Sequence, residues 1–383
     1  MHRGGDVSHQ LGLEQEETMH RAPTSCGHHC ARALLWIFLS AGAAAASAAP
    51  SYTLTDLAAL QPGHPNVVRG PNNQGRAGGG GRLVDDRGPR RGLIFEGGPV
   101  AQQVAGAAGS ENSTIYRIND GGTFVGSANS SNGLRAFAGS TGGATRELPP
   151  LPGDTNSAAF GINNLGQATG FSSGPGGQRA VTWNAGGTPA ALPAVAGASS
   201  SRGNDISTRG DVAGLVSGDA GDRPVLWPAG QAATELQLIP GDSTGEARAV
   251  NATGDAVGYT GSAGGVMRHA ALWTSAGLVT SLGALPGGEF SEAFGINDSG
   301  AVVGTTSSSA GRRAFLWTRT GGIQDLNTLI PPLHVVLTKA VGINNAGAIV
   351  AVGHAAPPGQ AGDDHAFHDA PLRVFLLRPV GAP

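Results

Sequence analysis

The feature that most constrains the fold of this chain is a strand–turn–strand pattern that occurs seven times. Its clearest copy is SEAFGINDSGAVVG, residues 291–304. Residues 293–297 alternate between small and larger side chains, as a strand with two different faces requires. Residues 297–300, Asn-Asp-Ser-Gly, have the composition of a tight turn, because Asn and Asp bond to their own backbone and Gly accepts a positive φ. An apolar stretch follows, and the whole segment therefore predicts a β-hairpin.

The copies keep a nearly constant spacing along the chain. Counted from the glycine that ends each turn, successive copies are 47, 44, 44, 44, 46 and 47 residues apart. A regular period of this length is typical of repeat architectures. Tryptophan and leucine positions recur in phase with the turns, which argues against chance similarity. The turn glycines are Gly75, Gly122, Gly166, Gly210, Gly254, Gly300 and Gly347.

Each unit contains four short strand segments bounded by Gly, Pro, Ser, Asn or Asp. Four strands in about 45 residues is the size of one blade of a β-propeller. A β-helix rung would be about half as long and would lack the hairpin signal. An open solenoid of small sheets would leave its sheet edges exposed. The sequence therefore predicts an all-β chain that forms a β-propeller of seven four-stranded antiparallel blades.

The two ends of the repeat region predict how the ring closes. Residues 52–57, YTLTDL, match the fourth strand of a unit although they precede the first copy. The last unit has a third strand at residues 374–377, but no fourth strand follows it. The N-terminal strand is therefore expected to complete the last blade and to lock the ring. An alternative takes residues 365–367 as the third strand of the last unit, and the ring then closes differently.

The first 49 residues have the pattern of a secretory signal peptide. An apolar run occupies residues 33–46, two arginines precede it, and residues 46–48 form an A-x-A cleavage pattern. The run is too short to favour a membrane anchor, so no membrane association is expected after cleavage. Residues 50–383 are then the seven-repeat propeller, located outside the cell or in the periplasm. The chain has two cysteines, Cys26 and Cys30, and both would be removed, so the mature protein would contain no disulfide.

The composition excludes some classes of partner. The net charge is −3 and charged residues make up 13% of the chain, whereas nucleic-acid binding usually needs a basic face. No cofactor is expected. The Asn and Asp side chains of the repeated turns could ligate a hard cation. Turn formation explains the same residues, however, and no metal is predicted.

Several segments resemble the HAF family of extracellular repeat proteins. These segments are GINNLGQATG at residues 161–170, GINDSGAVVG at 295–304, RRAFLW at 312–317 and HAF at 365–367. Units of that family look like GINNxGQVVG followed by HAFLW and DLGTL. The resemblance covers essentially the whole mature chain, but Arg replaces most of the HAF histidines. It implies a secreted bacterial repeat protein, and it implies neither an activity nor catalytic residues.

The connections between units are expected to gather at one mouth of the propeller channel, where many propellers bind ligands. Most of these connections carry a Pro-Gly turn followed closely by a polar residue. A good turn explains this pattern, and a ligand-binding rim is the alternative. An insertion at residues 354–373 adds further His and Asp residues. The candidate ligand-binding residues are Asp154, Asp242, Glu289, His64 and His334 in the connections, and Asp364 and His365 in the insertion; no catalytic residue is assigned.

Two functions fit these observations. The preferred one is a secreted, monomeric binding module without enzymatic activity, which recognises a glycan or another component of the cell envelope through its loop face. The alternative is an extracellular polysaccharide hydrolase or lyase that uses acidic residues or histidines at the channel mouth. Hydrolysis would need two carboxyl groups roughly 5–10 Å apart.

Overall fold

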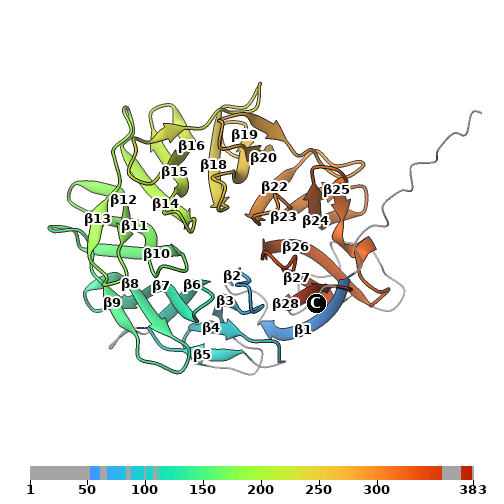
Figure 1. Ribbon diagram of the computed structural model, residues 1–383, viewed down its shortest axis with the longest axis horizontal. Helices are drawn as coiled ribbons and strands as arrows, with labels where there is room; N and C mark the ends of the chain where they lie inside the picture. The colour runs from blue at the N-terminus through green and yellow to red at the C-terminus, as the bar shows by residue number, and fades with distance from the viewer. Residues whose placement is uncertain are drawn as a thin grey trace, which may run out of the picture. The chain divides into compact units, whose positions relative to one another are not determined.

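The computed structural model describes residues 52–60, 67–82, 88–98, 101–106, 110, 112–355 and 372–381. These residues form seven four-stranded sheets that follow one another around a ring (Figure 1). All neighbouring strands within a sheet are antiparallel. The predicted seven-bladed β-propeller is therefore confirmed. No helix in the described part of the chain has the length and apolar character that a membrane span requires.

Blades 1 to 6 are each built from four consecutive strands. Blade 1 contains β2 (Val67–Arg69), β3 (Ala77–Gly81), β4 (Arg91–Phe95) and β5 (Gln102–Val104). Blade 2 contains β6 (Asn112–Ile118), β7 (Thr123–Ser130), β8 (Gly133–Ser140) and β9 (Arg146–Leu148). Blade 3 contains β10 (Asn156–Ile162), β11 (Ala168–Gly174), β12 (Gly177–Trp183) and β13 (Pro189–Ala191). Blade 4 contains β14 (Ser200–Ile206), β15 (Val212–Gly218), β16 (Gly221–Trp227) and β17 (Thr234–Glu235).

The remaining blades follow the same plan, with one change at the end of the chain. Blade 5 contains β18 (Thr244–Val250), β19 (Ala256–Gly261), β20 (Arg268–Trp273) and β21 (Val279–Ser281). Blade 6 contains β22 (Ser291–Ile296), β23 (Val302–Ser308), β24 (Gly311–Thr318) and β25 (Gly322–Asp325), followed by the short 3-10 helix η1 (Leu326–Leu329). Blade 7 contains β26 (Val335–Ile343), β27 (Ile349–Ala355), β28 (Leu372–Pro379) and, from the other end of the chain, β1 (Tyr52–Leu60).

The ring closes through β1, as the sequence predicts. This strand pairs with β28, so that Tyr52 lies opposite Pro379 and Leu60 lies opposite Leu372. Residues 374–377 belong to β28, which makes them the third strand of blade 7. The alternative third strand, residues 365–367, lies outside the described residues. The closing contact thus joins segments more than 300 residues apart in the sequence, and it leaves neither of the two terminal blades incomplete.

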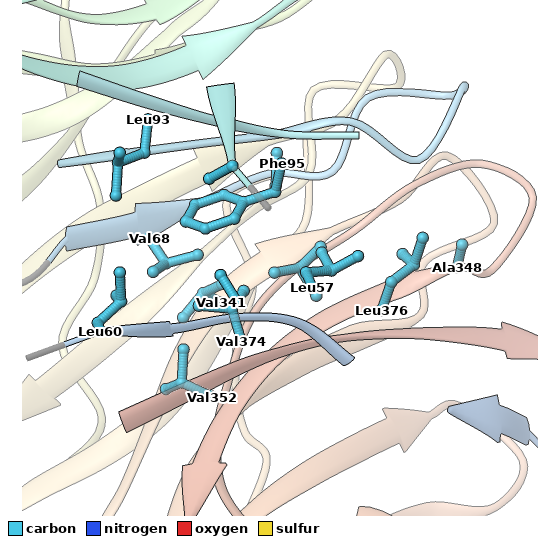
Figure 2. Packing of buried hydrophobic residues seen from close by; sticks show 14 residues of the cluster. Leu57, Leu60, Val68, Leu93, Phe95, Val341, Ala348, Val352, Val374 and Leu376 are labelled. Carbon is cyan, nitrogen blue, oxygen red and sulfur yellow. The ribbon is translucent and has the colours of Figure 1, made fainter. Parts of the chain in front are cut away.

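Apolar side chains of β1 fill the space between blade 7 and blade 1 (Figure 2). Leu57 and Leu60 are fully buried and belong to one cluster with Val68 and Phe95 of blade 1 and Leu376 of blade 7. Burial of a leucine side chain contributes about 1.5–3 kcal/mol. The N-terminal strand therefore closes the ring with side-chain packing in addition to its backbone hydrogen bonds.

The tryptophans of the third strands join neighbouring blades. Trp183, Trp227 and Trp273 are buried, with at most 1% of each residue exposed. Each indole N–H donates to a backbone carbonyl of the preceding blade, at 2.7, 2.9 and 2.6 Å respectively. The acceptors, in the same order, are Pro149, Pro193 and Gln237. This bond satisfies the one polar atom of a large buried side chain, which explains why tryptophan recurs at this position.

The first asparagine of each repeated turn has two structural roles. Its side-chain oxygen closes its own turn: Asn163 Oδ1 accepts from the backbone N–H groups of Leu165 and Gln167, both at 3.0 Å. Its side-chain amide donates to the backbone carbonyl of the corresponding residue in the next blade. Six such bonds are present among the described residues, with N···O distances of 2.9–3.2 Å. The donors are Asn72, Asn119, Asn163, Asn251, Asn297 and Asn344.

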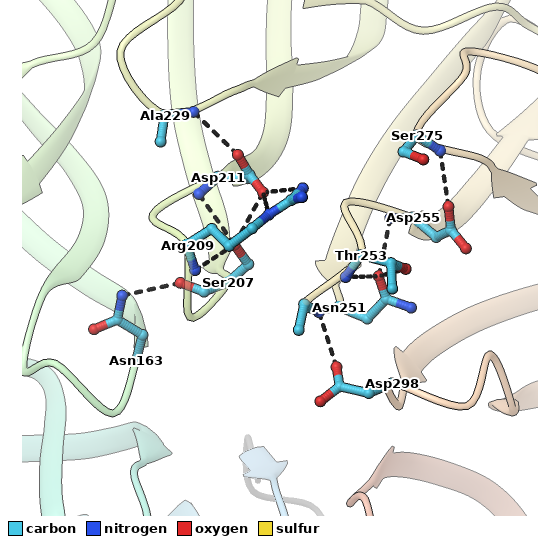
Figure 3. Close-up of polar contacts among 11 residues, drawn as sticks. Asn163, Ser207, Arg209, Asp211, Ala229, Asn251, Thr253, Asp255, Ser275 and Asp298 are labelled. Atoms are coloured by element: carbon cyan, nitrogen blue, oxygen red, sulfur yellow. Dashed lines mark hydrogen bonds and ion pairs between the residues drawn. The ribbon is translucent and has the colours of Figure 1, made fainter.

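One junction lacks this bond because blade 4 carries serine in place of asparagine. Ser207 accepts the amide of Asn163, but its hydroxyl cannot reach forward as an amide does, and it bonds within its own turn to Asp211 and Arg209 (Figure 3). A carboxylate replaces part of the missing link, because Asp205 accepts from the backbone N–H of Val250 in blade 5 at 3.3 Å. The junction between blades 4 and 5 is thus the one described junction where the ring of asparagine amides is interrupted.

Replacing Ser207 with asparagine is expected to stabilise the protein by about 0.5–1.5 kcal/mol, the net value of one hydrogen bond. The new amide would donate to the carbonyl of Asn251, and its oxygen would take over the turn bonds that Ser207 now accepts. Chemical denaturation measures the change. The control Ser207→Ala should be destabilised, because it removes the turn bonds without adding a link. A Ser207→Asn protein that is no more stable than the wild type would contradict this account.

Candidate functional site: the central channel

A cavity of about 430 Å³ lies in the channel at the centre of the ring. Nearly all of its lining side chains come from the first strand of a blade, which is the innermost strand of each sheet (Figure 1). This volume lies within the range of small-molecule sites. The lining residues are Arg69, Tyr116, Arg117, Phe160, Arg202, Asn204, Glu246, Arg248, Arg268, Glu292, Phe294 and Lys339.

A β-bulge in the inner strands directs side chains into this cavity. In blades 2 to 6 the pairing of the first two strands shifts by one residue, and the unpaired residue lies three positions before the repeated asparagine or Ser207. An extra residue of this kind bends a strand and re-aims its side chain. The bulged residues of these five blades line the cavity, namely Tyr116, Phe160, Asn204, Arg248 and Phe294, whereas Val341 at the corresponding bulge of blade 7 does not. Arg69 occupies the same position of the repeat in blade 1.

Sequence reasoning missed these residues because it expected ligand contacts in the loops. A signal was nevertheless present, since this position varies between Arg, Tyr, Phe, Asn and Val while its neighbours repeat. Where one position of a repeated strand varies while its neighbours are kept, its side chain is not required to form the blade. The bulge cannot be read from the alternation of side chains alone, which is why the position was attributed to one face of a regular strand.

One half of the channel wall is an ion-paired network. Glu246 is bound by Arg202 at 2.7 Å and by Arg248 at 3.2 Å, and Glu292 is bound by Arg248 at 3.3 Å and by Arg268. Burial by itself raises the pKa of both glutamates, but the neighbouring arginines, Arg248 foremost, outweigh it and hold the two pKa values below their ordinary range. Both carboxylates are therefore ionised at neutral pH and neutralise the arginines around them.

Another ion pair spans two blades. Arg117 of blade 2 reaches Asp205 of blade 4 at 2.6 Å. The strand between them carries Gly161, and a Cβ atom there would lie only 2.9 Å from the Cα of Asp205. A side chain at this position would obstruct the close approach of the inner strands. The small residue thus allows neighbouring blades to pack and leaves room for the ion pair.

The channel wall also combines aromatic rings with cations. The rings of Tyr116 and Phe160 meet edge to face, with centroids 4.9 Å apart. The ammonium group of Lys339 lies 3.8 Å from the centroid of the Phe294 ring. The guanidinium carbon of Arg248, on the inner strand of blade 5, lies 4.6 Å from the centroid of the same ring. Such contacts stabilise a cation by about 0.5–2 kcal/mol, but they leave its charge uncompensated.

Two cations of the cavity have no carboxylate partner among the described residues, namely Arg69 of β2 and Lys339 of β26. Neither side chain makes a hydrogen bond or an ion pair within that part of the chain, although solvent in the channel reaches Arg69. Loss of solvation, then Arg248 and Arg117, lower the pKa of Arg69 to about 10. Loss of solvation, then Arg69, Arg248 and Arg312, lower the pKa of Lys339 to about 8, although Glu292 acts in the opposite direction. Lys339 is also the only lysine in the sequence.

Replacing Lys339 with methionine is expected to stabilise the protein at pH 7 by about 1–3 kcal/mol. The folded-state pKa of about 8 lies below the ordinary 10.5, so the unfolded chain binds the proton more tightly. The protonated lysine therefore destabilises the fold below pH 8, and this cost disappears as the pH rises from 8 to 10.5. Denaturation at pH 7 and pH 10 tests the point, with exposed Arg319→Met as control. An equal gain at both pH values would contradict the electrostatic cause.

Two residues predicted to form a binding rim are bound within their own blades. The Asp154 carboxylate accepts from Ser172 at 2.6 Å and from Arg179 at 2.9 Å. The Asp242 carboxylate contacts Thr260 and the Nδ1 atom of His269, the latter at 3.0 Å. Arg179 and His269 stand at the position that resembles the first residue of the HAF motif, and in these two blades its partner is the acid of the preceding connection.

The other predicted rim residues are placed differently. Glu289 and His334 are exposed, and neither lines the channel cavity. His64, Asp364 and His365 lie outside the described residues. The described members, Asp154 and Asp242 included, are therefore not brought together in the channel cavity. In the described ranges, no cluster of three or more His, Cys, Asp or Glu residues has the geometry of a metal site.

Solved structures with the same architecture share little sequence with this chain. Streptogramin B lyase superposes with a TM-score of 0.52 at 11% identity, over 86% of this chain and 98% of the lyase. A prolyl endopeptidase gives 0.53 at 10% identity, over 76% of this chain and 46% of that one. TolB from Acinetobacter baumannii gives 0.44 at 12% identity, over 61% of this chain and 58% of that one. This chain thus spans about half the length of the latter two.

No protein-family model matches the chain, and no curated protein sequence does. The resemblance to the HAF family therefore stays a prediction. At identities of 10–11% the lyase and the endopeptidase show what the strand pairing also shows, which is the β-propeller fold.

Proposed function

We propose that this protein is a secreted binding module that holds a saccharide in its central channel. The observation that carries the proposal is the cavity of about 430 Å³, in which aromatic rings stand beside hydrogen-bond donors and acceptors. Ligand sites typically combine apolar surface with a few well-placed polar groups in this way. The rings of Tyr116 and Phe160 supply flat apolar surface, and Asn204 and the arginines supply polar contacts. The signal-like residues 1–49 and the resemblance to the HAF family support secretion.

The state of the channel carboxylates favours binding over polysaccharide hydrolysis. Hydrolysis needs a carboxyl group that is protonated at working pH and donates its proton to the leaving oxygen. Glu246 and Glu292 both have pKa values below the ordinary range, because arginines surround them. Neither is suited to act as that general acid. The two glutamates serve instead to fix the orientation of Arg202, Arg248 and Arg268 in the channel wall.

A glycan array with the purified protein tests this function. We expect selective binding of one class of saccharide, and at least tenfold weaker binding by Phe160→Ala, which removes an aromatic face from the cavity. Leu165→Ala is the matched control, because Leu165 is 64% exposed on a turn and does not line the cavity. Circular dichroism checks that both variants fold. Absence of any saccharide binding, or equal loss in both variants, would contradict the proposal.

A further inference from the structure

We propose that Arg69 and Lys339 form a subsite for an anionic group, a carboxylate or a sulfate, carried by the saccharide that occupies the channel. The identity of the ligand as a saccharide rests on the function proposed above, whereas the anion subsite rests on the charges of the cavity. The two side chains come from β2 and β26, the inner strands of blades 1 and 7. The subsite therefore lies at the junction where the ring closes.

The distribution of charge in the cavity points to this place. Among the described residues, six cationic side chains and two carboxylates line the cavity. The four cations of blades 2, 4 and 5 are all paired, with Asp205, Glu246 or Glu292. Arg69 and Lys339 remain, and the charge of Arg69 lowers the pKa of Lys339. Positive charge is thus left unpaired at Arg69 and Lys339, which form no ion pair with a carboxylate of the described residues.

An anion bound between Arg69 and Lys339 would compensate the positive charges of both side chains. Two like charges on neighbouring inner strands repel one another. A carboxylate or sulfate restores a partner to both. Arginine can hold either group through two parallel hydrogen bonds, and lysine adds a compact positive charge. The contact with Phe294 limits the directions in which the Lys339 ammonium group can point.

The surroundings of the pair favour a sugar acid over a free inorganic anion. Phe294 adjoins Lys339, and Tyr116 lines the same cavity as Arg69. Apolar ring faces beside a cationic pair match a ligand whose ring carries the charged group on one edge. A peptide that presents its terminal carboxylate could use the same pair, and it is therefore an outcome of the test.

The experiment compares acidic and neutral sugars by calorimetric titration. Glucuronate and galactose 6-sulfate are titrated against the parent sugars glucose and galactose, with a C-terminal tripeptide amide and its free acid as a further pair. The proteins are the wild type, Arg69→Met and Lys339→Met, with Arg319→Met as a control for lost surface charge. We expect at least a tenfold preference for an acidic sugar over its parent in the wild type and the control. Both channel variants should lose that preference.

The outcomes separate this inference from the proposed function. If acidic and neutral sugars bind equally well, the saccharide site stands and the anion subsite is overturned. The subsite is likewise overturned if both methionine variants keep the preference. If the free tripeptide acid, acetate or sulfate raises the melting temperature of the wild type but not of Arg69→Met, while no sugar binds, the anion subsite stands and the saccharide function falls. Lys339→Met is expected to fold, since it removes an uncompensated charge.

Discussion

Replacing Leu57 with alanine is expected to lower the free energy of unfolding by about 2–5 kcal/mol, the range for a leucine removed from a well-packed core. Leu57 is fully buried in β1, between blade 7 and blade 1. Its side chain touches the cluster that holds the N-terminal strand in place, so the loss falls on the contact that closes the ring. We also expect proteases to cleave the variant near the N-terminal strand faster than the wild type.

Denaturation in guanidinium chloride and limited proteolysis measure the two effects. Thr53→Ala is the matched control, because Thr53 lies in the same strand, is exposed and makes only a 3.3 Å hydrogen bond to the carbonyl of Arg378. Its effect should stay within about 0.5 kcal/mol. If Leu57→Ala costs less than about 1 kcal/mol, the N-terminal strand does not lock the ring through its apolar side chains.

Replacing Gly342 with alanine should destabilise the protein by about 3 kcal/mol or more, at the upper end for overpacked sites. A Cβ atom on Gly342 would lie 1.4 Å from the carbonyl oxygen of Gly70 in blade 1. The obstacle is backbone, which cannot rotate away as a side chain can. The inner strands of blades 7 and 1 would have to separate, and this junction also joins the two ends of the chain.

The repeat offers a graded series for this test. A Cβ atom on Gly161, the corresponding residue of blade 3, would lie 2.9 Å from the Cα of Asp205, so Gly161→Ala should cost less than Gly342→Ala. Blade 5 carries Ala249 at this position, and Ala249→Gly should cost about 1 kcal/mol from lost burial and chain entropy. Equal costs for the two Gly→Ala variants, or wild-type stability in Gly342→Ala, would contradict the packing argument.

The turn sequence illustrates how far local chemistry can be read without a structure. Asn297-Asp298-Ser299-Gly300 predicts a hairpin, and the structure contains it: the backbone N–H of Asn297 bonds to Ala301, and that of Gly300 bonds to Asn297. The sequence could not reveal that the Asn297 amide reaches Asn344 of the next blade. That bond depends on the angle between blades, which no segment of the chain determines alone.

The loop prediction shows the opposite case. Asp154 and Asp242 follow Pro-Gly turns, and composition alone suits both a binding rim and a structural turn. Their partners, Arg179 and His269, lie 25 and 27 residues further along the chain. The choice between the two interpretations depends on contacts between a connection and the third strand of the same blade, and these contacts exist only once the blade has formed.

The sequence by itself determined the number of blades, the four strands in each and the role of the N-terminal strand in closing the ring. Those properties follow from a regular period and from side-chain alternation, which are local. Only the tertiary structure decided which residues face the channel. A one-residue bulge places Tyr116, Phe160 and Arg248 there, and closure of the ring brings Arg69 and Lys339, 270 residues apart, to adjacent inner strands. The site is made of side chains that meet because the ring closes, so no single repeat contains it.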